Sequence, residues 1–467
     1  MIRNYDAAKT SDLFHGWGNG NATADALLWS QLSKIRSRSR DLGRNNHWVR
    51  KFFKMVQRNV IGSSGIIFQS KVMDPNGKPD TMANQLIESA WAKWCKSCDV
   101  TDSLSFKQFC TLAVGAVAQD GEVLIRIVEG YPNEFGFALQ LIEADHLPEH
   151  FHDFKRNIRM GIEYDEWGKA QAYHLYENHP GDVHAAVSQK IIRVPADQII
   201  HLYVKDRVSQ GRGVPWMHAA MTNLKMLGGY EEAELVAARL GAAKSGFYTK
   251  PAGEDYESSE TDEYGDPVQE VTPGMIETLP DGWGFQSFDP THPTSAFKDF
   301  AKAILRGIAS GFDVSYNYLS NDLEGVNYSS IRAGVLDERD AWMVLQSWFI
   351  ERLNDRIYER WLKMALLTQQ IPLPYSKIKK FNAPKWMPRR WSWVDPQKDM
   401  TSNILAMKAG FKSPSMIAAE MGYDIEEVYM SIKRDQELRK KIGITTASDA
   451  ELLQLLSEIN QQGEDDA

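Results

Sequence analysis

The chain has 467 residues, of which 43% are hydrophobic and 25% charged, and this composition excludes an intrinsically disordered protein. Its length predicts roughly two to four structural units. The net charge of -9 argues against a simple nucleic-acid coating protein. No apolar run approaches the ~20 residues of a membrane helix, and the polar N-terminus excludes a signal peptide. An odd number of cysteines, three, fits a reduced, cytosolic protein.

The charges are distributed unevenly along the chain. Residues 34–58 carry nine Lys and Arg residues against one acid, Asp41, whereas residues 251–297 carry eleven acids and no Lys or Arg. Separate basic and acidic blocks predict contacts with different partners at different places. The bases of 34–58 could bind DNA or pair with acids on a neighbouring subunit, and we favour pairing.

The N-terminal part of the chain is expected to be mostly helical. Residues 1–22 are polar and predict an extended arm, and residues 23–58 have a helical pattern that breaks at the Gly/Asn turn 42–46. A strand is expected within 60–72 and two helices within 82–120. The candidate core positions of these two helices are Trp91, Trp94, Phe106, Phe109 and Leu112.

The pattern changes to period two between residues 122 and 204. The segments VLIRIV, FALQLI, AYHLYE and QIIHLYV are rich in β-branched and aromatic residues and are bounded by turn residues, which predicts strands. The turn Glu166-Trp167-Gly168 predicts a hairpin. Because regular strand–helix alternation is missing, we expect a mixed or antiparallel sheet in an α+β, mainly helical fold.

A helix over 216–243 is expected next, and its second half is rich in small residues. Ala237, Ala238 and Gly241 would allow a neighbouring helix to approach closely, as in a tightly packed ring, although Ala-rich composition favours a helix by propensity alone. Residues 244–295 lose the helical period. They contain the acidic stretch EDYESSETDEYGDP and then short predicted strands.

Helices dominate the rest of the chain. A helix over 296–311, capped by Thr294 or Ser295, has an apolar stripe, and a polar, turn-rich loop follows it. A helix of ~60 Å is expected over 329–370. The stripe consists of Phe297, Phe300, Ile304 and Ile308, and the C-terminal helices are expected over 399–409, 414–421, 424–441 and 447–461.

No catalytic motif is present: the sequence lacks a GxxxxGK[ST] phosphate loop and a GxSxG elbow, so we expect neither an enzyme nor a cofactor. Cys95 and Cys98 form a CxxC without the second pair that a structural zinc needs, and helix packing is the preferred interpretation. The histidines near 150 are interpreted as surface residues rather than metal ligands. This second candidate comprises His146, His150, His152 and Asp153.

Lys298, Lys302 and Arg306 recur at i, i+4 and i+8 and therefore share one helical face, called here the basic stripe. Like charges at this spacing weaken an isolated helix, and a nearby polyanion would offset that cost. The alternative is a solvated face, but only one acid, Asp299, adjoins the stripe in sequence. Ion pairs within the helix therefore do not fully explain it.

Four segments, in the right order, resemble the lambda-like family of tailed-bacteriophage portal proteins. They are SRSRDLGRNNHWVRKFFKMVQRNVIGSSGIIFQ, RVSQGRGVPWMHAAMTNLKMLGGYEEAELVAARLGAA, NDLEGVNYSSIRA, and WSWVDPQKD with GFKSPSMIAAEMGYDIEEV. The resemblance covers nearly the whole chain. It implies an N-terminal arm (1–22), a wing (23–215 and 329–400, the latter with the long channel helix), two stem helices (216–243 and 296–311), a clip (244–295), a tunnel loop (312–328) and a crown with the C-terminal tail (401–467).

The resemblance also implies a function. Portal proteins of this family form a ring, usually of about twelve subunits, at one capsid vertex, through which double-stranded DNA is packaged and ejected. Implied partners are DNA without sequence preference, the terminase large subunit, a head–tail connector and the major capsid protein. The expected location is the virion, and the host cytoplasm during assembly, with no membrane contact.

The resemblance places residues at two sites besides the basic stripe. Inward-projecting tunnel-loop residues are expected to be Asn317, Tyr318, Asn321, Asp322, Asn327, Tyr328 and Ser329. The acids expected to dock partners at the clip are Glu254, Asp255, Glu257, Glu260, Asp262 and Glu263. Two alternatives remain: a capsid or scaffolding interaction protein without a DNA channel, and a metal-dependent nuclease with carboxylates in 254–266.

Overall fold

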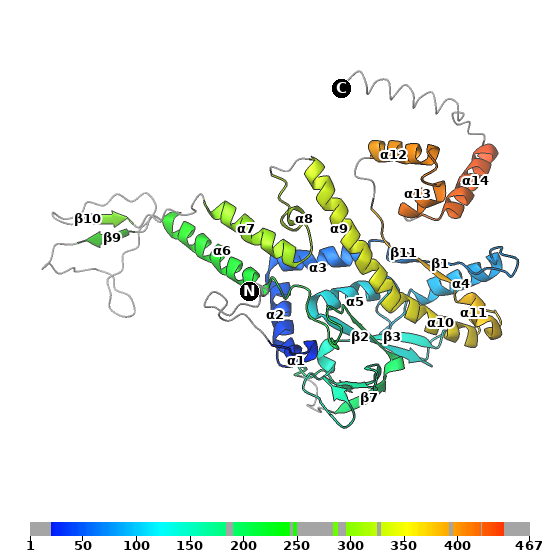
Figure 1. Cartoon of the computed structure of the whole chain (residues 1–467), viewed down its shortest axis with the longest axis horizontal. Coiled ribbons are helices and arrows are strands. Elements are labelled where there is room, and N and C mark those ends of the chain that lie inside the picture. The colour runs from blue at the N-terminus through cyan, green and yellow to red at the C-terminus, as the bar shows by residue number, and fades with distance from the viewer. Residues whose placement is uncertain are drawn as a thin grey trace, which may run out of the picture. The chain divides into compact units, whose positions relative to one another are not determined.

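The computed structural model describes residues 20–183, 190–242, 246–249, 284–287, 296–324, 328–391, 396–421 and 423–442 (Figure 1). The chain divides into two compact units. The first comprises residues 1–61 and 72–383, and the second comprises 62–71 and 384–467. Helices predominate and the described sheets are small and antiparallel, which confirms the predicted mainly helical α+β fold.

Three helices open the first unit. The predicted break falls at Asn46, the end of the expected turn 42–46, whereas the break between the first two helices at 29–31 was not predicted. Asn46 lies between α2 and α3 in extended conformation, and its side chain accepts the backbone N–H groups of Trp48 and Val49, so it caps α3. The apolar face of α3, including Phe52 and Val56, is buried. These helices are α1 (Ala24–Leu28), α2 (Leu32–Asn45) and α3 (His47–Val60).

An aromatic core holds α4 (Thr81–Trp94) and α5 (Phe106–Asp120) together. The Trp91 ring of α4 packs edge-on to that of Phe106 of α5, with centroids 5.2 Å apart, and to that of Trp361, with centroids 4.8 Å apart. Four of the five predicted core residues are buried, but Leu112 is 51% exposed. The prediction for Leu112 was wrong because it turns away from the face of α5 that carries Phe109 and Ala113.

The period-two pattern predicted strands in one mixed or antiparallel sheet, and the structure forms them into two antiparallel sheets. One has the order β3-β2-β8 and the other β4-β5-β6-β7. The predicted hairpin joins β5 and β6, and Gly168 supplies the left-handed φ of 78° at its turn. The strands are β2 (Glu122–Glu129), β3 (Phe137–Ile142), β4 (Ile158–Arg159), β5 (Ile162–Tyr164), β6 (Ala170–Tyr176), β7 (Ile191–Pro195) and β8 (Ile199–Tyr203), with short 3-10 turns at Ala144–His146 and Ala196–Gln198.

The helices α6 (Met221–Ala242) and α7 (Ala296–Gly311) pack against each other (Figure 1). The expected bounds of α7 are confirmed, whereas α6 begins at Met221 rather than at 216 because a turn precedes it. The antiparallel strands β9 (Gly246–Thr249) and β10 (Gly284–Ser287) belong to the segment between these helices. The proposed caps Thr294 and Ser295 lie outside the described residues.

The segment after α7 differs from a simple loop. It contains a short helix, α8 (Tyr316–Ser320), which is capped by the Ser315 hydroxyl and ends at Asn321 in left-handed conformation. The long predicted helix consists of α9 (Tyr328–Phe349), a π-helical turn (Ile350–Asn354) and α10 (Asp355–Leu367). A 3-10 turn (Tyr375–Lys377) and α11 (Ile378–Phe381) close the unit.

The second unit pairs β1 (Ile67–Ser70) with β11 (Pro384–Met387). Its helices are α12 (Pro396–Lys408), α13 (Pro414–Glu420) and α14 (Ile425–Ile442), close to the predicted ranges, and the predicted helix 447–461 lies outside the described residues. Across the described part of the chain, every helix is too short or too polar to span a bilayer.

Candidate functional site

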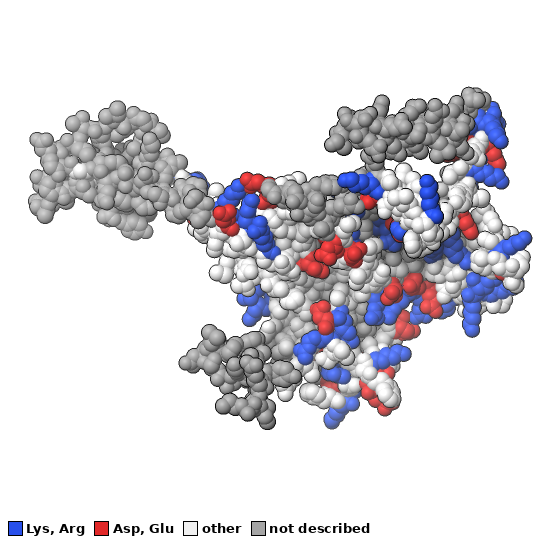
Figure 2. Space-filling view, turned by 45° about the horizontal axis from the view of Figure 1, so that its top comes forward, with Lys and Arg blue, Asp and Glu red and all other residues white. Residues whose placement is uncertain are grey.

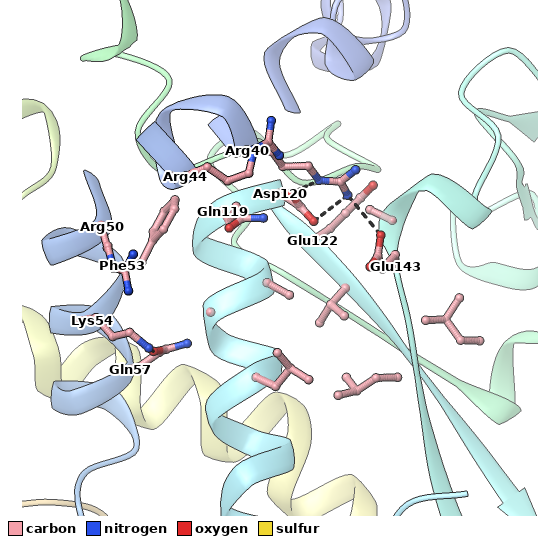
Figure 3. Close-up of a pocket in the computed structure, with 18 residues that line it drawn as sticks. Arg40, Arg44, Arg50, Phe53, Lys54, Gln57, Gln119, Asp120, Glu122 and Glu143 are labelled. Carbon is pink, nitrogen blue, oxygen red and sulfur yellow. Dashed lines mark hydrogen bonds and ion pairs between the residues drawn. The ribbon is translucent and has the colours of Figure 1, made fainter. Parts of the chain in front are cut away.

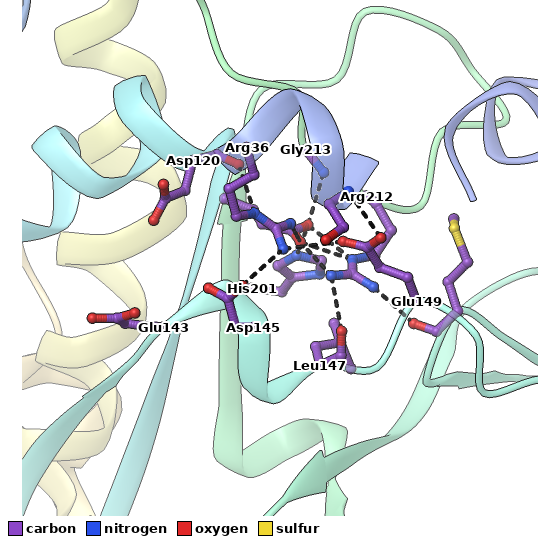
Figure 4. A network of polar contacts seen from close by, with 12 residues as sticks. Arg36, Asp120, Glu143, Asp145, Leu147, Glu149, His201, Arg212 and Gly213 are labelled. Atoms are coloured by element: carbon purple, nitrogen blue, oxygen red, sulfur yellow. Dashed lines mark hydrogen bonds and ion pairs between the residues drawn. The ribbon is translucent and has the colours of Figure 1, made fainter. Parts of the chain in front are cut away.

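A buried charge network in the first unit is centred on Glu122, at the start of β2. Figure 4 shows Arg36, Arg212 and His201 of this network. The Glu122 carboxylate is fully buried and accepts hydrogen bonds from Arg212 (2.8 Å), Arg36 (3.0 Å), His201 (2.9 Å) and the backbone N–H of Gly213 (2.8 Å). Burial alone would raise the pKa of Glu122, but Arg212, His201 and Arg36 outweigh it and hold this pKa well below its usual range.

Part of the basic segment 34–58 is used inside the subunit. Arg36 also bonds to Glu149 at 3.1 Å, and Arg40 bonds to both oxygens of Asp120 at 2.8 Å and contacts Asp145. For Arg36 and Arg40 the predicted pairing with a neighbouring subunit is therefore wrong, because acids of the same chain neutralise them. The partners lie 80 or more positions away in sequence, so no local pattern indicated them.

Three of the remaining bases of the segment border a cleft of about 850 Å³ (Figure 3). Arg44, Arg50 and Lys54 are exposed along one wall, formed by α2 and α3. The apolar floor includes Phe53 and the exposed Leu112 of α5. We call this feature the basic cleft, and it is also lined by Arg40, Gln57, Gln119, Asp120, Glu122, Leu141, Ile142 and Glu143.

The basic stripe on α7 contacts two acids of the segment that follows α8. The Lys298 ammonium lies 2.7 Å from the nearer Glu324 carboxylate oxygen, and Lys302 lies 2.9 Å from Asp322 and 3.1 Å from Glu324. The Arg306 guanidinium lies over the ring of Tyr316, 5.4 Å from its centroid. Sequence analysis missed both carboxylate partners, although two acids spaced two apart after a turn-forming Asn were the available signal.

The loop itself is held in place by several polar contacts. The Tyr316 hydroxyl donates to Asp322 at 2.8 Å, and Lys51 of α3 donates to the Asn321 side chain. At the other end, the backbone N–H of Ser315 donates to Glu338 of α9 at 3.2 Å. Thus α3, α7 and α9 all contact the predicted tunnel loop.

The other predicted tunnel-loop residues lie in or beside helices α8 and α9, apart from one that falls outside the described residues. Asn317 is half-buried in α8 and Tyr318 is 46% exposed. Asn327 lies outside the described residues, and Tyr328 and Ser329 begin α9. Of the predicted set, the structure therefore brings Asp322 into contact with the basic stripe, whereas Asn321 contacts Lys51 of α3.

The small-residue positions of α6 lie near its end. Ala237 and Ala238 are half-buried, and Gly241 is helical. Ala238 and Gly241 follow the buried Leu227 by 11 and 14 positions, so helical spacing places them on the side that carries Leu227. Met226 (68% exposed) and Val236 (48% exposed) were not singled out in the sequence, yet they are large apolar residues left uncovered on α6.

Glu254, Asp255, Glu257, Glu260, Asp262 and Glu263 lie outside the described residues. On the described surface, Figure 2 shows Lys and Arg interspersed with Asp and Glu over the visible face rather than gathered into one large field of a single sign.

The cysteine candidate fits packing rather than metal binding. Cys98 and Cys110 are buried, and all three thiols are free. Burial raises the pKa of Cys95 and Cys110, so both stay protonated at neutral pH. Thiolate, not thiol, is the metal ligand, so this environment disfavours a metal.

The four residues of the histidine candidate do not bring their side chains together at one site. His146 bonds to the Tyr176 carbonyl and His152 accepts the Met160 N–H, while Asp153 pairs with Arg156. His150 packs edge-on to Trp29. Each of these four side chains therefore contacts a different partner, and only His150 and His152 are exposed.

A third group, Glu143, Asp145 and His179, does bring its ligand atoms within 4.8 Å of one another. However, His179 Nδ1 accepts the N–H of Gly181 at 3.0 Å, which leaves the proton of a neutral ring on Nε2, the atom facing Glu143 at 3.3 Å. Arg40 also forms an ion pair with Asp145. This geometry indicates an ion-pair cluster rather than an open metal site.

Comparison with known proteins agrees with the resemblance seen in the sequence. The family described as "Phage portal protein, lambda family" matches residues 10–346. The chain is 36% identical to the probable portal protein of Halomonas phage phiHAP-1, over 95% of this chain and 88% of that protein. It is 22% identical to the portal protein of Escherichia phage N15 and 21% identical to portal protein B of Escherichia phage lambda, each over 92% of this chain and 88% of the relative.

Among solved structures, the neck of an empty gene transfer agent particle matches with a TM-score of 0.46 and 14% identity, over 84% of this chain and 93% of that one. The family match covers well over half of the chain, and the phiHAP-1 relative aligns along almost all of it. The chain therefore belongs to the lambda family of phage portal proteins, structural and non-catalytic proteins whose oligomeric ring at the head–tail connection of the virion is the channel for packaging and ejecting double-stranded DNA.

Proposed function

We propose that this portal protein closes into a ring of about twelve subunits, with α6 and α7 as the stem helices and the basic stripe of α7 facing the duplex. The observation that carries this proposal is the position of the stripe. Its lysines lie on a helix whose contacts join it to α6 and to the predicted tunnel loop. Native mass measurement tests ring closure, since a monomer or dimer would contradict the proposal.

The contact with DNA is expected to be weak. A channel that bound the duplex tightly would stall it, whereas a few lysines among polar loop side chains keep it centred without reading sequence. The polar side chains of the tunnel loop would contact the phosphate backbone of the DNA without adding net charge. They are Asn317, Tyr318 and Asn321. The overall charge of -9 and the mixed surface charges also disfavour tight binding.

The stripe is tested by replacing Lys298, Lys302 and Arg306 with Gln. We expect normal assembly, because the buried residues Leu305, Ile308 and Ala309 of α7 are unchanged. DNA should still enter, but retention of packaged DNA should fall. Packaged length and leakage, compared with wild type at two salt concentrations, measure this effect. Equal values at both concentrations would show that the stripe does not contact DNA.

Partner docking is assigned to the clip and wing. The six clip acids Glu254, Asp255, Glu257, Glu260, Asp262 and Glu263 would attract basic surfaces of the terminase large subunit during packaging and of the head–tail connector afterwards, and the wing would face the major capsid protein. This support comes from sequence charge, with eleven acids and no base in residues 251–297. Assembly would take place in the host cytoplasm.

Neutralising these six acids to Asn or Gln should leave the ring intact and weaken partner binding. Electrostatic attraction is screened least at low salt, so the affinity difference from wild type should be largest there. Purified terminase large subunit, titrated against wild-type and variant rings, provides the measurement. Identical affinities at low salt would remove the electrostatic role of the clip.

A further inference from the structure

We propose that Asp322 and Glu324 form an acidic latch, which occupies the ammonium groups of Lys298 and Lys302 until phosphates of the duplex displace it. This inference rests on the proposed DNA contact and adds a regulation to the same site. The two lysines are matched by two carboxylates of their own chain, so the closed site presents less positive charge than the sequence of α7 alone implies.

The contacts differ in strength along the site. Lys302 and Asp322 are 24% and 19% exposed and make the sheltered pair, while Lys298 and Glu324 are 60% and 63% exposed. Glu324 contacts both lysines and so links the two pairs. Its hydrogen bonds to Lys298 and Lys302 hold the pKa of Glu324 below its usual range, and those from Lys302 and Tyr316 do the same for Asp322. Both acids are therefore charged at neutral pH.

The backbone places the latch before any DNA arrives. Asn321 adopts a left-handed φ of 57°, which ends α8 and turns the chain toward α7. The backbone N–H of Glu324 then donates to Asp322 at 3.0 Å, and that of Asp322 donates to the Ser320 hydroxyl at 3.1 Å. The Tyr316 hydroxyl orients the second Asp322 oxygen. The two carboxylates are thus held by a short, ordered turn.

The same geometry explains why the latch can open. The exposed Lys298–Glu324 pair contributes little net stability, because water already solvates both of its charges. A duplex presents a row of phosphates that can replace the two carboxylates at the lysines. Asp322 and Glu324 would then move away from α7. Each phosphate contact must first displace a carboxylate. The latch therefore lowers the affinity of α7 for DNA and favours sliding of the duplex over tight binding.

The test is a titration of the purified ring with a fluorescent duplex oligonucleotide at several salt concentrations. Asp322→Asn with Glu324→Gln should raise the affinity by roughly three- to tenfold at low salt. It should steepen the dependence of log K on log salt by about two, because two lysines become available for phosphate contacts. A matched control, Glu351→Gln with Glu359→Gln, removes two exposed acids elsewhere and should change the affinity far less.

A second pair of variants separates the latch from the DNA contact. Lys298→Gln with Lys302→Gln should lower the affinity, and adding the two latch substitutions to it should change nothing further. If the lysine variant weakens binding while the latch variant matches wild type, the latch is wrong and the DNA contact stands. If the lysine variant binds like wild type, the DNA contact fails and the latch with it. Native mass of every ring confirms that assembly is intact.

Discussion

At the scale of single residues, His201 shows how burial decides a charge state. Its side chain is 3% exposed, and Nε2 lies 2.9 Å from Glu122. Nδ1 is buried without a hydrogen-bond partner among the described residues, so a second proton there would have no acceptor. Burial, assisted by Arg212 and Arg36, outweighs the attraction of Glu122 and holds the pKa of His201 below its ordinary value.

His201 should therefore make the fold less stable in acid. The unfolded chain takes up a proton near the ordinary pKa of ~6.5, while the folded histidine stays neutral until a lower pH. The free energy of unfolding should fall as pH drops through this window, by at most about 1.4 kcal/mol per pH unit. His201→Gln keeps a donor for Glu122 but cannot titrate, so its stability should change less with pH.

Unfolding monitored between about pH 5 and pH 8 measures this difference, because histidine titrates in that range. The exposed His47→Gln variant is the control and should keep the wild-type slope. Parallel pH profiles for wild type and the His201 variant would show that the buried ring does not supply the acid sensitivity.

At the scale of elements, local signals predicted what local physics determines. The break near Asn46, the hairpin turn at Gly168 and the bounds of α7 follow from residues within a few positions, so they were readable in the sequence. The short helix α8 was missed because its Asn and Ser residues favour turns equally well. The pairing of Arg36 with Glu122 was missed because it joins positions 86 apart.

Helix α6 gives the prediction at this scale. Gly241 follows the side of the helix that carries Leu227, where small residues permit close packing. Gly241→Leu should overpack that seam at a cost of ~1–3 kcal/mol in each subunit and disfavour ring closure. Native mass should show fewer closed rings than wild type. The matched change Gly241→Ala, which favours a helix, should close normally, and normal rings from the Leu variant would place the position toward solvent or the lumen.

At the scale of the whole molecule, five of the nine bases of the segment 34–58 fall into two groups. Arg36 and Arg40 compensate buried acids within the subunit, whereas Arg44, Arg50 and Lys54 line the basic cleft. On the rim of that cleft, the exposed acid Glu143 is outnumbered by these three bases. Of the predicted pairs with acids of a neighbouring subunit, those made by Arg44, Arg50 and Lys54 are the ones that the cleft can bring together.

If the cleft bases hold a neighbour, replacing Arg44, Arg50 and Lys54 with Gln should weaken the ring without unfolding the subunit, since all three side chains are exposed. Each exposed pair contributes little, but the loss is repeated at every interface, so rings should dissociate at lower salt than wild type. Native mass across a salt series measures the midpoint. The control Lys34→Gln, Arg38→Gln, Lys107→Gln removes the same charge from exposed positions outside the cleft lining and should keep the wild-type midpoint. If both triple variants dissociate together, overall charge alone governs the ring and the cleft is not a subunit contact.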